Sequence, residues 1–330
     1  MRRRLCGSLL VVVWATLLSH TSTSPLVPVS QFLSQNAGGE RRRATRGPIE
    51  LSSGARVEFN SFPSSCLKEE REYSILLPPG YSKNNQRYPV VYFLHGLNND
   101  HTSWTVDRYG HIHEQVDKLI AEKAIPEILM VHPKGDNSFY TNYADGSRNY
   151  EDFITSELIA YVEKTYRAKP GSRWRAIGGT SMGGFGALKI AFKHKDLYSA
   201  TAAHSPIVFL ADPTQMSDQT KSSGRFEWFT HLIAPMFGDP IDIGRWEANN
   251  PLDLAKQADL KGLRIYFDYG TGDRYNQSIG LGQGVKSLDT VLTQRQIAHV
   301  FKEHPNEPHG WELVSLHISE SLPFLCESFR

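Results

Sequence analysis

Short apolar segments bounded by turn residues recur along the chain from residue 49 onward and predict strands. Residues 72–77 alternate apolar and polar side chains and end at Pro78-Pro79-Gly80, as a strand followed by a turn does. Residues 88–94 and 128–131 are continuously apolar, which favours strands buried on both faces. Similar segments predict further strands at 174–177, 200–203, 263–269 and 299–301.

Segments with helical periodicity lie between these strands. Apolar side chains recur at helical spacing between Ile154 and Thr165, and Pro170-Gly171 then breaks the chain. A second helix is predicted at 185–194, after a glycine-rich turn. This alternation is typical of an α/β fold, a mainly parallel central sheet with helices on both faces. We expect one such domain over residues 48–330.

The first residues follow the pattern of a secretory signal peptide. Three arginines at 2–4 precede an apolar run at 9–18 and a small polar stretch at 20–24. The alternative is a membrane anchor, but a helix over residues 9–18 would span about 15 Å, half of a ~30 Å hydrocarbon core. We therefore expect removal of residues 1–24, a secreted (periplasmic or extracellular) location and a flexible lead-in at 25–47.

Composition and charge exclude several classes of protein. The 330 residues are 40% hydrophobic and 22% charged, the balance of a globular protein. The formal net charge of +1 becomes −2 without residues 1–24, which carry three arginines and no acidic residue. Such a charge does not attract a polyanion, so we expect no nucleic acid partner. Outside the predicted signal peptide no apolar run reaches 18 residues, and we expect no stable membrane span.

Two cysteines, Cys66 and Cys326, remain after the predicted cleavage. In an oxidising compartment the pair predicts a disulfide, and two free thiols are the alternative. The chain has no Cys-x-x-Cys or His-Glu-x-x-His spacing, so we expect neither a metal nor a cofactor.

The segment Gly179-Thr180-Ser181-Met182-Gly183 lies between a predicted strand and a predicted helix. This is the G-x-S-x-G pattern of a nucleophile elbow, in which the glycines allow a turn that side chains would obstruct. We expect Ser181 to be a nucleophile at a helix N-terminus, where the helix dipole favours developing negative charge. The alternative is a glycine-rich turn with a structural role.

A serine nucleophile needs a base, and the base needs an orienting acid, in the chain order serine, acid, histidine. Asp273 follows the strand predicted at 263–269, and we prefer it to Asp268, which lies within that strand. His309 lies between a proline and a glycine in a loop, and we prefer it to His304 as the base. The predicted catalytic residues are therefore Ser181, Asp273 and His309.

Acyl transfer also needs backbone donors for an oxyanion. One is the N–H of Met182, the residue after the nucleophile. The second is the N–H of Leu97, which Gly96 allows to turn inward after the strand at 88–94. His95 itself is more typical of a packing residue.

Residues 206–249 are longer than a usual strand-to-helix loop and predict an insertion that could cap the site. Its aromatic side chains include Trp228 and Phe237, which we expect to contact substrate. In the alternative interpretation, Phe226, Phe229, Ile233 and Phe237 recur at helical spacing because one helix face is buried.

Several motifs together resemble the putative esterase family, the esterase D-like branch of the α/β-hydrolases. The resemblance covers about residues 55–325, and its motifs in chain order are His95-Gly96-Leu97, Trp104, Ser138-Phe139-Tyr140-Thr141, Tyr150-Glu151-Asp152-Phe153, Gly179-Thr180-Ser181-Met182-Gly183-Gly184, Gly270-x-x-Asp273 and His309-x-Trp311. It implies an α/β-hydrolase fold. The insertion that we predict from the length of residues 206–249 follows the strand at 200–203, counted as the sixth of this fold. It also implies the Ser181, Asp273 and His309 triad, with Leu97 and Met182 as oxyanion donors.

That branch contains feruloyl and acetylxylan esterases, tributyrin esterases, mycolyltransferases and S-formylglutathione hydrolases. We therefore expect an exported serine carboxylesterase that acts through an acyl-enzyme on a small-molecule or polysaccharide-linked ester. An acyltransferase with the same triad is the first alternative. An S-formylglutathione hydrolase-type thioesterase is disfavoured by the export signal, and an inactive binding protein by the complete set of catalytic residue types.

Overall fold

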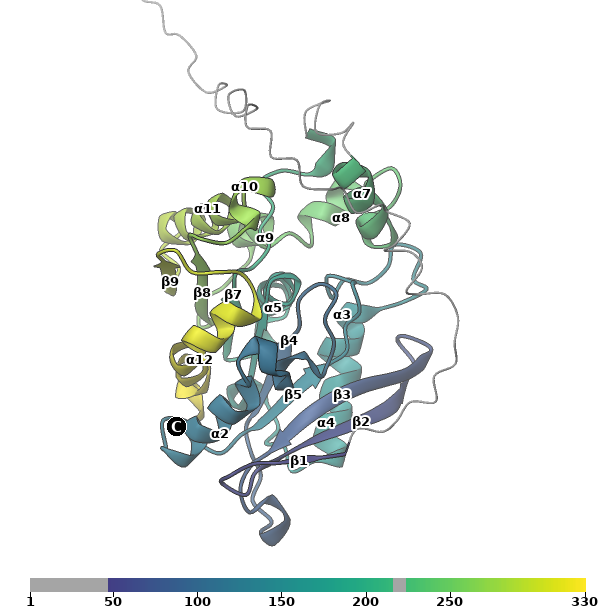
Figure 1. The fold of residues 1–330 in the computed structure, drawn as a ribbon. Helices are drawn as coiled ribbons and strands as arrows, with labels where there is room; N and C mark the ends of the chain where they lie inside the picture. Colours follow the sequence, from purple (N-terminus) through teal and green to yellow (C-terminus); the bar gives the residue numbers. More distant parts are fainter. Residues whose placement is uncertain (1–46, 216–223) are drawn as a thin grey trace, which may run out of the picture. The chain divides into compact units, whose positions relative to one another are not determined.

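The computed structural model of the chain describes residues 47–215 and 224–330. The predicted signal peptide, nearly all of the predicted lead-in and residues 216–223 of the predicted insertion lie outside these residues. The described strands form one sheet in the order β1-β2-β3-β5-β4-β6-β7-β8-β9 (Figure 1).

The sheet combines an antiparallel edge with a parallel centre. Strands β1 to β3 pair antiparallel, and β3 pairs antiparallel with β5. From β5 through β4 and β6 to β9 all pairs are parallel. The strands are β1 (Ile49–Glu50), β2 (Arg56–Ser64), β3 (Glu69–Leu77), β4 (Val90–Leu94), β5 (Leu129–Pro133), β6 (Arg175–Thr180), β7 (Ala200–His204), β8 (Arg264–Gly270) and β9 (His299–His304).

Two separate apolar cores cover the two faces of this sheet, because successive side chains of a strand point to opposite faces. In β4, Val90, Tyr92 and Leu94 enter one core, whereas Val91 and Phe93 enter the other. The first core is closed by α4 (Leu158–Thr165), α5 (Met182–Lys193), α9 (Pro251–Gln257) and α11 (Leu281–Gln294). The second is closed by α2 (Ile112–Ala121) and α12 (Trp311–Cys326).

This architecture confirms the predicted α/β fold with helices on both faces. The predicted helix over Ile154 to Thr165 begins earlier, with α3 (Tyr150–Asp152) and a π-helical turn (Phe153–Glu157) before α4. The sequence pattern does not predict β2, because charged and polar residues separate Val57, Phe59 and Phe62 and the strand contains Pro63. The described residues also form 3-10 turns at Tyr81–Lys83, Ser103–Thr105, Asp107–Tyr109, Ser172–Trp174, Lys195–Leu197, Pro213–Gln215 and Glu327–Phe329.

The predicted disulfide between Cys66 and Cys326 is wrong, because both thiols are free. Cys66 lies in the turn after β2 and packs against the first core, whereas Cys326 ends α12 inside the second core. The sheet therefore separates the two sulfur atoms. Burial and, to a smaller extent, the neighbouring Glu157 raise the pKa of Cys66 to about 11.

The described part of the insertion is helical. It contains α7 (Gly224–Phe237) and α8 (Ile243–Glu247), and α9 follows it. Ile233, Phe237 and Trp246 are buried, so one face of α7 packs on the domain. The structure thus supports the alternative interpretation of this segment, in which one helix face is buried.

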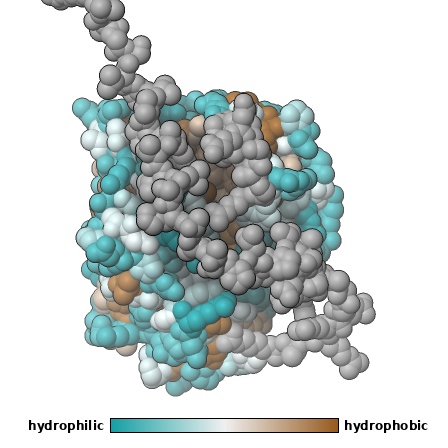
Figure 2. Space-filling model, turned by 45° about the horizontal axis from the view of Figure 1, so that its top comes forward, coloured by the Kyte–Doolittle hydropathy of each residue, from teal (hydrophilic) through white to brown (hydrophobic). Residues whose placement is uncertain are grey.

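The visible surface of the described residues is mostly hydrophilic, with scattered apolar patches (Figure 2). Among the described residues, the large apolar side chains that are exposed are those of Leu210, Trp228, Ile279 and Leu316. No helix within residues 47–215 and 224–330 is both long enough and apolar enough to cross a bilayer.

Candidate active site

Ser181 occupies a sharp turn between β6 and α5. Its φ of 58° and ψ of −118° are rare for a residue with a side chain, and such strain is concentrated at functional sites. The flanking glycines make the turn possible: a Cβ on Gly179 would lie 2.3 Å from the Gly183 carbonyl oxygen, and one on Gly183 would lie 2.1 Å from that of Leu94. The predicted spacing therefore has a direct steric cause.

Ser181, His309 and Asp273 are brought together as one hydrogen-bonded series. The Oγ atom of Ser181 lies 2.8 Å from Nε2 of His309, and Nδ1 of His309 lies 2.5 Å from Oδ2 of Asp273. All three residues follow the carboxyl ends of parallel strands, β6, β9 and β8 respectively. In open α/β sheets this edge is where ligands bind.

The loops that carry Asp273 and His309 hold each other in place. A Cβ on Gly270 would lie 2.1 Å from the Glu307 carbonyl oxygen, and one on Gly272 would lie 2.6 Å from that of Asn306. The loops are therefore packed backbone against backbone. The N–H of Tyr275, in α10 (Tyr275–Ser278), donates to Oδ1 of Asp273 at 2.8 Å. The sequence pattern does not predict this contact.

Tyr275 also packs on the base, with its ring edge-on to the His309 imidazole at 4.6 Å. Only its position two residues after Asp273 could have suggested this role. Trp311, proposed above only through a motif, donates its indole N–H to Asn99 Oδ1 at 3.1 Å and packs in the second core.

The competing residues Asp268 and His304 lie in a different, buried cluster. Nδ1 of His204 lies 3.0 Å from Asp268 Oδ1, and Nε2 of His304 lies 3.4 Å from Asp268 Oδ2. Burial alone would raise the pKa of Asp268, but its histidine neighbours lower it to about 2. Neither Asp268 nor His304 is hydrogen-bonded to Ser181.

The predicted oxyanion donors, Leu97 and Met182, follow the neighbouring strands β4 and β6. Leu94 of β4 pairs in register with Gly179 of β6, which places the loop after β4 beside the nucleophile turn. A Cβ on Gly96 would lie 3.3 Å from Ser181 Cβ. The loop with Leu97 therefore lies beside Ser181, and Met182 follows Ser181 as the first residue of α5.

Three residues near the base, His304, Glu307 and His317, come within metal-binding distance of one another. Their geometry does not favour an ion, because the His304 and His317 rings are stacked at 3.5 Å with 18° between their planes. An ion in the plane of one ring would lie outside the plane of the other. A second such group is formed by His111, His113 and Glu114.

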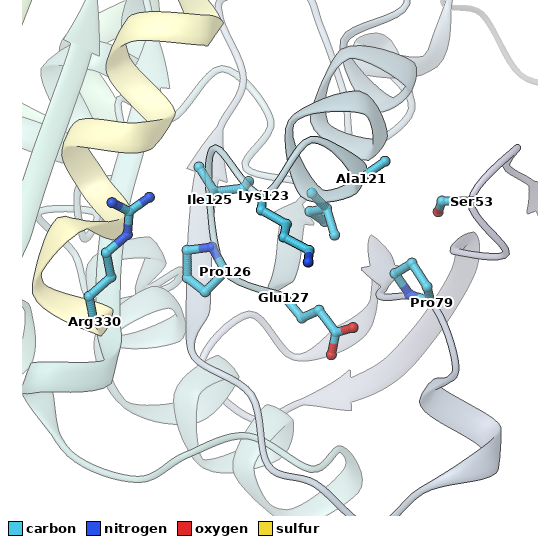
Figure 3. A pocket seen from close by; sticks show the side chains of 9 residues that line it. Ser53, Pro79, Ala121, Lys123, Ile125, Pro126, Glu127 and Arg330 are labelled. Atoms are coloured by element: carbon cyan, nitrogen blue, oxygen red, sulfur yellow. The ribbon is translucent and has the colours of Figure 1, made fainter.

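A pocket of about 710 Å³ in the described residues lies away from this site. It lies around the segment before β5, at the amino ends of the parallel strands and thus at the opposite edge of the sheet from Ser181. Figure 3 shows Lys123, Pro126 and Glu127 between Arg330 on one side and Pro79 on the other. A pocket of about 590 Å³ lies beside the Asp273 loop and is lined by Tyr269, Thr271, Asn276, Gly282, Gln283, Lys286, Ser287 and Thr290.

The two predicted substrate contacts differ in exposure. Trp228 on α7 is 55% exposed, whereas Phe237 is 1% exposed and packs 4.9 Å from the Trp246 ring. The structure thus leaves Trp228 available to a ligand and places Phe237 in the core.

The chain resembles known proteins both in sequence, over part of its length, and in structure, over most of its length. Esterase Rv1288 of Mycobacterium tuberculosis (strain ATCC 25618 / H37Rv) is 32% identical over 153 residues, which cover 46% of this chain and 32% of the relative. The chain thus spans about a third of that relative's length. A solved ferulic acid esterase is 24% identical, with a TM-score of 0.68 over 84% of this chain and 99% of that one.

An S-formylglutathione hydrolase from Agrobacterium tumefaciens is 20% identical, also with a TM-score of 0.68, over 86% of this chain and 98% of that one. These likenesses show the α/β-hydrolase fold. The family model described as "Putative esterase" matches residues 64–317, well over half of the chain. The chain therefore belongs to this esterase family.

Proposed function

We propose that the chain is an exported serine carboxylesterase that hydrolyses carboxylic esters through an acyl-enzyme on Ser181. The observation that carries the proposal is the hydrogen-bonded series of Ser181, His309 and Asp273 at the carboxyl edge of the sheet. Membership of an esterase family supports the reaction class. Export rests on the signal-like pattern at residues 1–24.

In the first half of the reaction, Ser181 Oγ attacks the ester carbonyl carbon and His309 Nε2 takes the hydroxyl proton. The carbonyl electron pair moves onto oxygen, and the N–H groups of Leu97 and Met182 donate to the resulting oxyanion. When the intermediate collapses, the bond to the alkoxy oxygen breaks. His309 returns the proton to that oxygen, so that a neutral alcohol leaves.

The second half repeats these steps with water. His309 takes a proton from water as its oxygen attacks the acyl carbon, and the acid is released when the Ser181 ester bond breaks and His309 reprotonates Oγ. Asp273 accepts the Nδ1–H bond, which holds the imidazole in the tautomer whose Nε2 can accept a proton. The N–H of Tyr275 stabilises the ionised Asp273.

The substrate class that we propose is a small-molecule or polysaccharide-linked ester. Support comes from the solved relatives, which include proteins described as ferulic acid esterases. Exposed Trp228, on the helix after β7, offers an aromatic surface for an aryl or acyl group.

The test is a set of initial rates of the purified protein on p-nitrophenyl acetate, butyrate and octanoate, on methyl ferulate and on acetylated xylan, each with and without an added alcohol. Release of free acid supports the esterase. Transfer of the acyl group to the added alcohol, in preference to water, would instead show an acyltransferase. Absence of turnover on every ester would contradict the proposal and favour a binding protein.

A further inference from the structure

His95, beside the proposed oxyanion donor, has both of its ring nitrogens engaged by backbone groups. Its Nε2 lies 2.8 Å from the N–H of Gly135, and its Nδ1 lies 2.8 Å from the carbonyl oxygen of Gly96. The side chain is 1% exposed, and burial lowers its pKa to about 4, so the ring is neutral near neutral pH. A nitrogen that accepts from an N–H carries no proton, so the single ring proton is on Nδ1 and is donated to Gly96.

This hydrogen bond determines the direction of the next amide. The Gly96–Leu97 peptide is trans and planar, so the Leu97 N–H points away from the Gly96 carbonyl. The N–H of Asn99 donates to the same carbonyl at 3.2 Å. Two donors thus hold the carbonyl on one side of the loop and leave the Leu97 N–H directed to the other side.

The imidazole is itself held by the loop after β5. The Tyr140 hydroxyl donates to the His95 carbonyl oxygen at 3.0 Å, and a Cβ on Gly135 would lie 2.2 Å from the Tyr140 ring. Phe139 and Tyr140 both have positive φ, 49° and 53°, so the loop keeps a strained conformation that its contacts must stabilise. These contacts explain the Ser138-Phe139-Tyr140-Thr141 motif, to which no role had been given.

We propose that His95 is a positioning residue for the oxyanion hole: by donating from Nδ1 to the Gly96 carbonyl, it aims the Leu97 N–H at the oxyanion formed on the Ser181 substrate. The inference rests on the proposed esterase function. It assigns His95 no contact with substrate and no proton transfer. Its effect falls on kcat, because the oxyanion is absent from the bound ester and develops only in the transition states and the tetrahedral intermediates between them.

The two ring nitrogens of His95 can be tested separately, because an Asn side chain replaces Nδ1 and a Gln side chain replaces Nε2. An Asn side chain carries its amide nitrogen one bond from Cγ, as Nδ1 is, and can still donate to Gly96. A Gln side chain carries its amide one bond further out, as Nε2 is, and keeps only the contact to Gly135. We therefore compare His95→Asn with His95→Gln.

For p-nitrophenyl acetate, we expect His95→Gln to lower kcat by at least ~10-fold with KM within about 3-fold, because removal of one oxyanion donor costs ~10²–10³-fold and a misdirected donor costs part of this. His95→Asn should retain most of kcat. Affinity for a trifluoromethyl ketone, whose adduct with a serine carries the oxyanion, should fall with kcat in His95→Gln and not in His95→Asn.

The matched control is His132→Gln, which alters another buried histidine that stacks on Trp104 and makes no hydrogen bond to the oxyanion loop. It should leave kcat within about 2-fold. Equal kcat in the two His95 variants and the wild type, each folded by its thermal melt, would overturn the inference, as would equal losses in both variants. A wild-type protein without activity on any ester would instead refute the proposed function itself.

Discussion

At the scale of the residue, the chain contains two hydrogen-bonded Ser-His-Asp series, and their position and exposure distinguish them. Ser321 Oγ lies 2.8 Å from His204 Nε2, and His204 Nδ1 lies 3.0 Å from Asp268, so a second Ser-His-Asp series exists. All three of its residues are fully buried, and no ester could reach Ser321. Ser181, in contrast, is 7% exposed and lies in the turn after β6, at the carboxyl edge of the sheet.

We predict opposite effects at these two clusters. Asp273→Asn and His309→Ala should each lower kcat by at least ~10³-fold. The first removes the carboxylate that holds the histidine in its reactive tautomer, and the second removes the base. Asp268→Asn and His304→Ala should leave kcat within a few-fold. The measurement is kcat on p-nitrophenyl butyrate, corrected for the folded fraction.

The double variant of Asp273 and His309 provides the control. Because the triad acts as a unit, its loss should be far smaller than the product of the two single losses. Losses from the Asp268 or His304 changes that match those at Asp273 and His309 would show that the acid and the base have been assigned to the wrong residues.

Local chemistry explains which site residues could be predicted. Ser181 was identified because the glycine spacing is a steric requirement of the turn itself. Asp273 and His309 were chosen from the order of elements and loop context, and the structure brings them together with Ser181. The packing of the Tyr275 ring on His309 and the hydrogen bond from Gly135 to His95 form only when loops distant in sequence meet, and no local pattern encodes them.

At the scale of the element, strands buried on both faces are predictable because a short, continuous apolar run between turn residues is typical of such a strand. Strand β2, which lies between β1 and β3, is not predictable in this way, since charged and polar residues separate its apolar side chains and its pairing with β3 is a tertiary contact. The insertion shows the same limit. Its helical spacing predicted α7 but could not separate aromatic residues that pack on the domain from those that remain exposed.

Trp228 and Phe237 should therefore respond differently to replacement by alanine. Phe237→Ala should lower the free energy of unfolding by about 3–5 kcal/mol and change kcat/KM for all esters by the same factor, because it leaves a core cavity beside Trp246. Trp228→Ala should leave stability nearly unchanged. It should alter the ratio of kcat/KM between octanoate or ferulate and acetate esters by roughly 10-fold.

Denaturant unfolding and kcat/KM on the three esters check both expectations. A uniform effect of Trp228→Ala on every ester would place the determinants of specificity outside α7. A selective effect of Phe237→Ala at unchanged stability would show that this side chain does reach the substrate.

At the scale of the whole molecule, buried carboxylates should make the fold sensitive to acid. The pKa of Asp268 falls from 3.8 to about 2 in the folded protein, against the effect of its burial. Burial would likewise raise the pKa of Glu151, but Lys189, Lys193 and His194 lower it well below its ordinary value. A lowered pKa contributes stability above the unfolded-state value, and that stability is lost as pH falls toward the folded-state value.

For Asp268 the window lies between pH 3.8 and about 2, and the lost contribution is about 2 kcal/mol. We expect the free energy of unfolding in urea to fall across this window in the wild type. In Asp268→Asn it should be lower at pH 7 and should decrease less on acidification, since the titrating group is absent. Parallel pH profiles for the two proteins would exclude this carboxylate as a source of acid sensitivity.

The central claim is that Ser181 is the nucleophile of an esterase, and the most direct measurement is kcat of the wild type and of Ser181→Ala on p-nitrophenyl butyrate. We expect Ser181→Ala to lower kcat by at least ~10³-fold with an unchanged thermal melt and circular dichroism spectrum, because the nucleophile is lost while the fold and the oxyanion donors remain. A Ser181→Ala protein that retains a large fraction of the wild-type kcat would contradict it.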